Sequence, residues 1–300
     1  MKTLETSFAS RVRLYLGALI AMLLAGSVVQ SEAQITNITK IANGHVTSVG
    51  FDPNSGLDYW TINGVNQLSQ ESFYFNSGSG VTELNNSMII SESVSHTASP
   101  SSGYNELSVA YDLGSGFEAD FTYVLGIAGN NYSLTPTIYI YNNNLSGSAN
   151  ISFYQFATFV LGNASGSQNV QMSTITPGSQ YQAYQTGGGA SLTDLVQPIT
   201  PVGVTITTEM QADSGAPFGP SNISANPLDT NPLAANQLAG SGSVDFAYEW
   251  DVTGLQAGTS FEISESSETI TVPEPSSMAL VASGIFALAL MSRRRISKKA

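Results

Sequence analysis

Short stretches in which apolar and polar residues alternate occupy most of the middle of this chain. Leu107–Leu113 alternates with a period of two residues, and Phe117–Tyr123 places its acids on one side and its aromatic rings on the other. This pattern is typical of β-strands with one face in water. Ile151–Leu161 is apolar on both faces, which indicates a central strand buried between two layers.

The same reasoning predicts further strands, and turn-forming residues separate them. The additional strands are expected at residues 72–75, 87–93, 137–141, 202–211, 244–251 and 260–271. The Asn142–Gly147 connection has turn chemistry suited to a hairpin. Gln185–Ala190, which is rich in glycine, and Ala212–Pro232, which is rich in Pro and Asn, are predicted to be long surface loops that could divide two sheets or two subdomains.

Between the two termini no segment keeps a helical period over three turns, and Pro232–Leu238 is the one short helix-like exception. Many short strands with frequent turns predict an all-β, double-layer antiparallel fold like a β-sandwich, flanked by an N-terminal signal helix and a C-terminal short transmembrane helix. We find no repeat of fixed period, which argues against a propeller or a β-helix. We expect one exported domain at residues 34–271, between a signal peptide at 1–33 and a sorting segment at 272–300.

The first 33 residues have the order of a secretory signal peptide. A basic region comes first, followed by the apolar run Leu14–Val29 and by small residues at Ser31 and Ala33. Small side chains at these two positions fit signal peptidase, so we expect cleavage between Ala33 and Gln34. The alternative is an N-terminal anchor that is not cleaved.

The last residues form a short apolar segment that ends in positive charge. Met278–Met291 is apolar except for two small residues, and its 14 positions reach only about 21 Å as a helix. The hydrocarbon core of a bilayer is about 30 Å thick, so the segment is a marginal span. Arg293, Arg294 and Arg295, with two lysines after them, would stop it on the cytoplasmic side and hold the chain in a membrane transiently.

Pro273-Glu274-Pro275, the short apolar helix and the terminal Arg cluster together resemble the PEP-CTERM sorting signal of bacterial exported proteins, over about the last 28 residues. The resemblance implies recognition by exosortase, a membrane-embedded cysteine protease that would remove the anchor near this tripeptide. It also implies release to the cell surface or to the extracellular matrix of bacteria that make exopolysaccharide, as in a biofilm. The two prolines would keep the strip extended and without helical hydrogen bonds, which suits a protease.

Charge and cysteine content remove several classes of function. The net charge is −13, and no Lys or Arg occurs between Lys40 and Arg293. Such a body cannot neutralise the phosphates of a nucleic acid or clamp an anionic substrate with arginine. The chain has no cysteine, so neither a disulfide nor a thiolate metal site can form.

Acidic and aromatic residues are most concentrated in Asp245–Asp251. As a strand it would place its three acids on one face and Phe246, Tyr248 and Trp250 on the other. Carboxylates spaced by about 7 Å could bind Ca²⁺ weakly, or Glu249 and Asp251 could act as a glycosidase acid/base pair. The more common meaning of the pattern is a wet strand face over an aromatic core stripe.

Other candidates are weaker. His45 and His96 stand alone and no cysteine accompanies them, so a zinc site is not expected. A Ser-His-Asp triad is not expected either, because the sequence has no Gly-x-Ser-x-Gly elbow. Gly187-Gly188-Gly189 is read as a flexible loop, because no Lys or strand-to-helix context supports a phosphate cradle. Aromatic side chains could stack on sugar rings, although core or loop-anchoring roles are more common; the candidates are Tyr59, Trp60, Tyr104, Tyr181 and Tyr184.

The sequence therefore favours a non-catalytic exported surface or matrix protein that is processed by exosortase. Its expected partners are signal peptidase, exosortase and an extracellular polysaccharide; we expect no nucleic acid, catalytic residue, resident metal or cofactor. The alternatives are an extracellular carbohydrate-active enzyme that uses paired carboxylates and a carbohydrate-binding module that uses aromatic residues.

The absence of basic residues gives a direct test of the chain itself. Trypsin should find no site between Lys40 and Arg293, even in the unfolded protein, because it cleaves only after Lys or Arg. Mass spectrometry of a complete digest checks this. A tryptic end inside that interval would contradict it.

Overall fold

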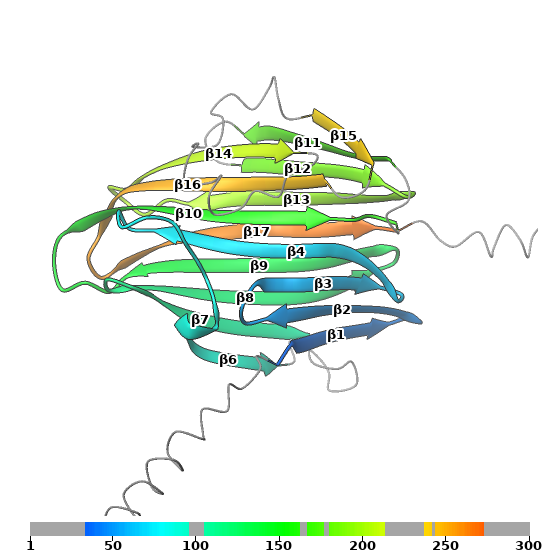
Figure 1. The fold of residues 1–300 in the computed structure, drawn as a ribbon, viewed down its shortest axis with the longest axis horizontal. Helices are drawn as coiled ribbons and strands as arrows, with labels where there is room; N and C mark the ends of the chain where they lie inside the picture. The colour runs from blue at the N-terminus through cyan, green and yellow to red at the C-terminus, as the bar shows by residue number, and fades with distance from the viewer. Residues whose placement is uncertain are drawn as a thin grey trace, which may run out of the picture. The chain divides into compact units, whose positions relative to one another are not determined.

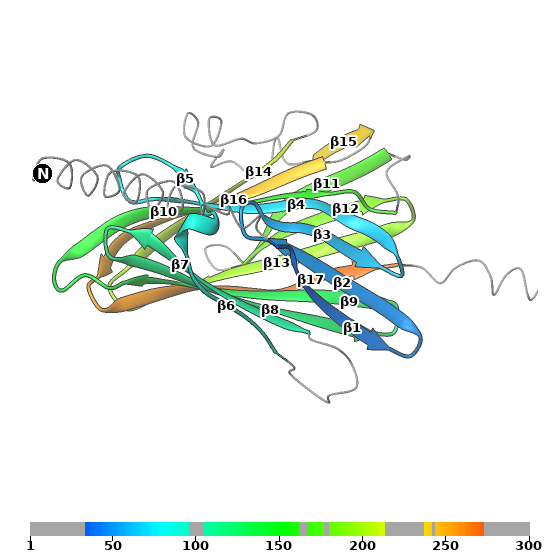
Figure 2. The same ribbon diagram turned by 60° about the horizontal axis from the view of Figure 1, so that its bottom comes forward.

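A computed structural model describes residues 34–95, 105–162, 167–176, 180–213, 237–241 and 244–272. Within these ranges the chain folds into strands β1 to β17 and one 3₁₀ turn, η1 (Asn86–Met88). The strands form two antiparallel sheets, so the predicted all-β, double-layer fold is confirmed. Figure 1 shows the strands running in similar directions, and Figure 2 shows the two layers.

The first sheet, here called sheet A, has the order β1-β2-β3-β4-β10-β16-β14, with β5 paired to β4. Its strands are β1 (Thr36–Ala42), β2 (His45–Asp52), β3 (Gly56–Ile62), β4 (Val65–Asn76), β5 (Thr82–Glu83), β10 (Ser148–Phe159), β14 (Thr205–Asp213) and β16 (Val244–Gln256).

The second sheet, sheet B, has the order β15-β11-β12-β13-β17-β9-β8-β7-β6. Its strands are β6 (Ile89–Ser95), β7 (Glu106–Gly114), β8 (Phe117–Ala128), β9 (Asn131–Asn142), β11 (Ser167–Thr176), β12 (Gln180–Gly187), β13 (Ala190–Ile199), β15 (Gln237–Ser241) and β17 (Thr259–Thr271).

The core lies between the sheets and is rich in aromatic rings. Phe73 of sheet A meets Phe121 of sheet B with ring centroids 4.8 Å apart, and it stacks on Phe153 at 5.9 Å. Because successive side chains of a strand point to opposite faces, alternate residues of each central strand supply this core. On β8 they are Phe117, Ala119, Phe121, Tyr123 and Leu125, as the sequence pattern predicts.

Most of the predicted strands form, with shifts at their ends. The stretch predicted at 87–93 begins with the turn η1, where the Asn85 side chain accepts a hydrogen bond from the backbone N–H of Ser87. The strand predicted from residue 202 begins at Thr205. The expected signal helix and C-terminal helix lie outside the described residues, and the described part contains no helix able to cross a membrane.

The prediction of a hairpin at Asn142–Gly147 is wrong. β9 pairs with β8 and β17, whereas β10 pairs with β4 and β16, so this connection passes from sheet B to sheet A. The Asn142 side chain fixes the crossing: its Nδ2 donates to the carbonyl of Leu255 at 2.8 Å, and its Oδ1 accepts from the backbone N–H of Asn144. The turn-forming residues are present as predicted, but the strand that follows them belongs to the other sheet.

The prediction of a long, flexible loop at Gln185–Ala190 is also wrong. Gly187 and Ala190 are paired residues of β12 and β13, so Gly188 and Gly189 alone form the turn. Both have positive φ, +55° and +83°, as a tight two-residue hairpin requires. The turn joins neighbours within sheet B and does not divide the protein. Of the helix-like stretch Pro232–Leu238, the described residues Gln237 and Leu238 begin β15.

This turn packs closely against Gly162, which gives a matched pair of substitutions. A Cβ on Gly188 would lie 2.6 Å from Gly162 backbone atoms, whereas a Cβ on Gly189 would meet nothing within 4 Å. Both changes to alanine meet the positive-φ penalty, but only Gly188→Ala adds a backbone clash, which typically costs about 1–3 kcal/mol. Urea unfolding should therefore show Gly188→Ala to be the less stable variant. Equal stabilities would contradict the close approach.

Candidate functional site

Four carboxyl side chains point into the space between the two sheets. Glu71 comes from β4, Asp194 from β13, and Glu265 and Glu268 from β17; each has an exposed fraction of 0%. We call these four residues the interior acid cluster. Carboxyl groups are rarely buried so completely unless they are paired, so this cluster is the most unusual chemical feature of the described structure.

A β-bulge in β17 places two of these acids on the same side. Ser264 pairs with Thr137 of β9 and Glu268 pairs with Leu134, so β17 uses one residue more than its partner over this span. In a regular strand, residues three apart point to opposite faces. The extra residue reverses the alternation, so Glu265 and Glu268 both face the core.

A second irregularity lies opposite, in sheet A. Thr158 of β10 pairs with Gln70 of β4, but the next residue, Phe159, pairs with Leu68, so Ser69 is the extra residue. Leu68 and Glu71 can therefore both face the core. Both strands that carry glutamates of the interior acid cluster are thus bulged beside them.

Gln155, on the central strand β10, is the principal hydrogen-bonding neighbour of Glu71. Its Nε2 donates to Glu71 Oε1 at 3.0 Å, and Gln155 is itself fully buried. In the register of sheet A, Gln155 lies between Phe73 of β4 and Tyr248 of β16. Tyr248 is in turn the polar neighbour of Asp194. Glu71 on sheet A thus has an amide as its neighbour, and Asp194 on sheet B has a phenol.

Burial dominates the electrostatics of the interior acid cluster. It raises the pKa of Glu71 from 4.5 to about 8, with the charge of Asp194 as the second cause and the Gln155 hydrogen bond opposing both. It raises the pKa of Asp194 from 3.8 to about 7, against a smaller opposing effect of Tyr248. The pKa values of Glu265 and Glu268 are raised well above the ordinary value, first by burial and then by the other acids.

No basic side chain in this part of the sequence can neutralise these acids, because Lys and Arg are missing between positions 40 and 293. In the described ranges, no three His, Asp or Glu side chains are arranged to hold a metal ion. Four mutually repelling charges in a closed interior would cost far more than protonation does. The cluster therefore binds protons at neutral pH, and its members titrate as a coupled group.

The predicted patch Asp245–Asp251 has the predicted alternation but not the predicted exposure. Phe246, Tyr248 and Trp250 face the core, whereas Ala247 belongs to a second apolar group on the outer face of sheet A. Asp245 and Glu249 are only 6% and 4% exposed, so the expectation of a wet strand face is wrong at these positions.

Each of the two proposed catalytic acids, Glu249 and Asp251, lies beside a polar side chain of β10. Glu249 lies opposite Glu209 of β14 and beside Tyr154 of β10. Asp251 accepts a hydrogen bond from Ser152 Oγ at 2.5 Å. The interior acid cluster and this outer patch lie on opposite faces of sheet A, so the structure does not bring them together.

The predicted histidine and aromatic candidates have mainly structural contacts. His45 Nδ1 lies 2.7 Å from the hydroxyl of Tyr132, which also accepts from Asn63, and this contact joins sheet A to sheet B. Trp60 is fully buried and donates to Thr47, so it cannot stack on a ligand at the surface.

The remaining aromatic candidates differ in exposure. Tyr181 is buried, Tyr59 is half-buried, and Tyr184 is exposed. Several predicted site residues lie outside the described part of the chain: His96, Tyr104, Ala33 of the predicted cleavage site, Pro273–Pro275 and Arg293–Arg295.

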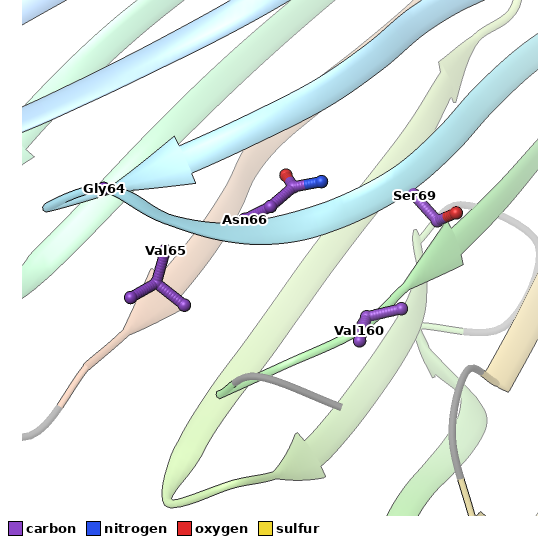
Figure 3. A pocket seen from close by; sticks show the side chains of 5 residues that line it. All are labelled: Gly64, Val65, Asn66, Ser69 and Val160. Atoms are coloured by element: carbon purple, nitrogen blue, oxygen red, sulfur yellow. The ribbon is translucent and has the colours of Figure 1, made fainter. Parts of the chain in front are cut away.

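A small surface pocket among the described residues contains no ionisable side chain. It has a volume of about 330 Å³ and lies beside the β3–β4 turn and the end of β10. Figure 3 shows its lining residues, Gly64, Val65, Asn66, Ser69 and Val160. Neither the interior acid cluster nor the Asp245–Asp251 patch contributes to it.

Sequence reasoning missed the interior acid cluster, although one signal was available. In Ala190–Val196 the buried positions are Ala190, Leu192, Asp194 and Val196, so the acid stands where the alternation requires an apolar residue. The same holds for Glu265 after Phe261 and Ile263. An acid in phase with the apolar residues of a strand is the signal for such a group.

Comparisons with known proteins identify the C-terminus. Residues 271–295 match the family described as the PEP-CTERM protein-sorting motif. This range contains Pro273, Glu274 and Pro275 and the three arginines, so the predicted resemblance is confirmed. The chain is therefore an exported, surface-sorted protein that carries the signal recognised by exosortase. Among curated proteins, none matches the chain.

Similar solved structures share only a distant likeness with this chain. A bacterial glucoamylase complexed with acarbose has 12% identity and a TM-score of 0.42, over 81% of this chain and 33% of the enzyme. The 4-alpha-glucanotransferase from Thermococcus litoralis has 6% identity and a TM-score of 0.34, over 81% of this chain and 40% of the enzyme. A protein from Synechocystis sp. PCC 6803 has 12% identity and a TM-score of 0.32, over 74% and 96%. The chain spans less than half the length of either enzyme.

The raised pKa values predict that stability falls as pH rises. The folded state keeps protons that the unfolded chain releases above about pH 4, so folding takes up protons. The free energy of unfolding should decrease through the window from about pH 4 to about pH 8, by about 1.4 kcal/mol per pH unit for each group that titrates. Urea unfolding at several pH values measures this slope.

Asp194→Asn should flatten that slope and stabilise the protein at pH 8, since it removes an acid that must otherwise ionise in the interior. Asp58→Asn is the matched control, because Asp58 is exposed on β3. The same slope in both variants would show that Asp194 ionises as it would in water.

Proposed function

We propose that this protein is a non-catalytic surface or extracellular-matrix protein, which exosortase releases from a transient membrane anchor and which associates with extracellular polysaccharide. The observation that carries the proposal is the sorting motif at residues 271–295. The lack of basic residues over the body of the chain supports it, because such a body is repelled by anionic headgroups once it is released.

The position of the motif relative to the fold supports release of an intact domain. β17 ends at Thr271, and the backbone N–H of Val272 still donates to the carbonyl of Asn130 at 3.1 Å. Pro273 is the next residue. A cut near Pro273–Pro275 would therefore leave every described strand in place.

The geometry of the acids supports a non-catalytic role. A glycosidase needs two carboxyl groups that both reach the bond to be cleaved. Glu249 is almost fully buried, and the four members of the interior acid cluster are closed off between the sheets. The described pocket offers no carboxyl group at all.

Deleting Pro273-Glu274-Pro275 should leave the protein at full length, apart from its signal peptide, in the membrane fraction. Exosortase would have no extended strip to engage, whereas the apolar segment and its arginines would remain. Intact-mass measurement of membrane and released fractions checks this outcome. Deletion of Lys298, Lys299 and Ala300 is the control, since it removes three residues beyond the matched range and should leave release unchanged. Normal release of the first variant would refute the proposal.

A further inference from the structure

The outer face of sheet B carries a pair of tyrosines on β9, the strand next to the middle strand β17. Ile138 and Ile140 are buried in the core, so Tyr139 and Tyr141 must point to the opposite face, where both are half-buried. Their ring centroids lie 6.1 Å apart and their planes differ by 30°. In Figure 2 no described strand covers this side of the sheet.

Each of the two tyrosines has an acidic neighbour on a flanking strand. The phenol of Tyr139 has Glu262 of β17 as its acidic neighbour, and the phenol of Tyr141 has Asp120 of β8. These strands flank β9 on its two sides. Both side chains are half-buried, so part of each remains accessible to solvent.

The surroundings of the tyrosine pair are acidic. In the register of sheet B, Tyr139 stands between Asp120 and Glu262, and Tyr141 stands between Glu118 and Ser260. Glu118 accepts a hydrogen bond from Asn143 at 2.9 Å. Lys40, the one Lys or Arg of the described residues, lies on β1 of the other sheet. Three carboxyl groups thus border two aromatic faces.

We propose that Tyr139 and Tyr141, with Glu118, Asp120 and Glu262, form a binding site for a polysaccharide that contains cationic amino sugars. This inference rests on the proposed function, which places the protein among extracellular polysaccharides. The polarised C–H groups of a sugar ring, and an ammonium group even more, are attracted to the negative face of an aromatic ring.

Charge decides between the classes of polysaccharide. Ammonium groups would form charge-assisted hydrogen bonds with the three carboxylates, whereas the carboxylates of an acidic polysaccharide would be repelled. A neutral glucan would gain the stacking but would leave the three negative charges without a counter-charge. A polymer of amino sugars is the ligand that would use both the tyrosine rings and the carboxylates of the site.

The test measures binding of a chitosan oligosaccharide to the purified full chain by calorimetry, at a pH near 6 where the glucosamine units are charged. Tyr139→Ala and Tyr141→Ala should each weaken binding roughly threefold to tenfold. Tyr184→Ala is the matched control: it removes an exposed tyrosine from the same face, on β12, which β13 and β17 separate from β9. It should leave the affinity unchanged. Tyr184 is also a sugar-stacking candidate from the sequence, so a loss of affinity in this variant would assign the ligand to Tyr184 and overturn the inference.

Comparison of probes separates this site from general attraction to an acidic protein. A neutral cello-oligosaccharide and a polygalacturonate should bind at least tenfold more weakly, and salt should weaken the chitosan complex. Tyr139→Ala and Tyr141→Ala leave the net charge of the protein unchanged. A loss of chitosan affinity in both variants therefore cannot come from the net charge. Absence of chitosan binding, equal binding of the neutral probe, or binding that ignores both tyrosines would overturn the inference.

Failure of this inference can be told apart from failure of the proposed function. Export and trimming are measured by intact mass and do not depend on the tyrosines. A protein that is trimmed and released normally, but does not bind the chitosan probe, would refute the binding site alone.

Discussion

The interior acid cluster has to be close to neutral for the two sheets to meet. Four carboxyl groups share a closed space with Gln155, Tyr123 and Tyr248. The sequence supplies no Lys or Arg between positions 40 and 293 to neutralise them. Burial and the charges of these acids raise the pKa of Tyr123 and of Tyr248 well above the ordinary value, so both phenols stay neutral as well. The stability of the protein is therefore tied to proton uptake, and the aromatic core around this group must supply the favourable free energy.

One irregular strand connects this interior to the other features of the molecule. Before its bulge, β17 directs Glu262 to the outer tyrosine pair and Glu265 to the core. After the bulge the alternation is reversed, so Glu268 also faces the core and Thr271 reaches the surface, where its hydroxyl donates to Asn131. A β17 without the extra residue could not place Glu265 and Glu268 together in the core.

The sequence predicted the class of fold well and the site poorly, for different physical reasons. Alternation identified β7, β8, β10 and the first part of β16, because their inward residues are apolar. It missed β12 and β13, whose inward positions include Gln185 and Asp194, and it missed the strands of the β1–β3 region. Alternation also cannot assign a sheet, which is why the β9–β10 connection was mistaken for a hairpin. In Thr137–Tyr141 both faces are apolar or aromatic, so nothing local shows that the tyrosines point outward.

The end of β17 is a suitable place from which to present a sorting segment. The strand is hydrogen-bonded on both sides, to β13 and to β9, and Thr271 is paired with Ser191 on one side and Asn131 on the other. A force applied to the C-terminal segment would act on the hydrogen bonds of β17 to both β13 and β9 at the same time. An edge strand, which is paired on one side only, would separate from its sheet more easily. The last residues before Pro273 are therefore held in an extended conformation by the fold itself. The fold thus fixes where the exported body ends and where the part to be processed begins.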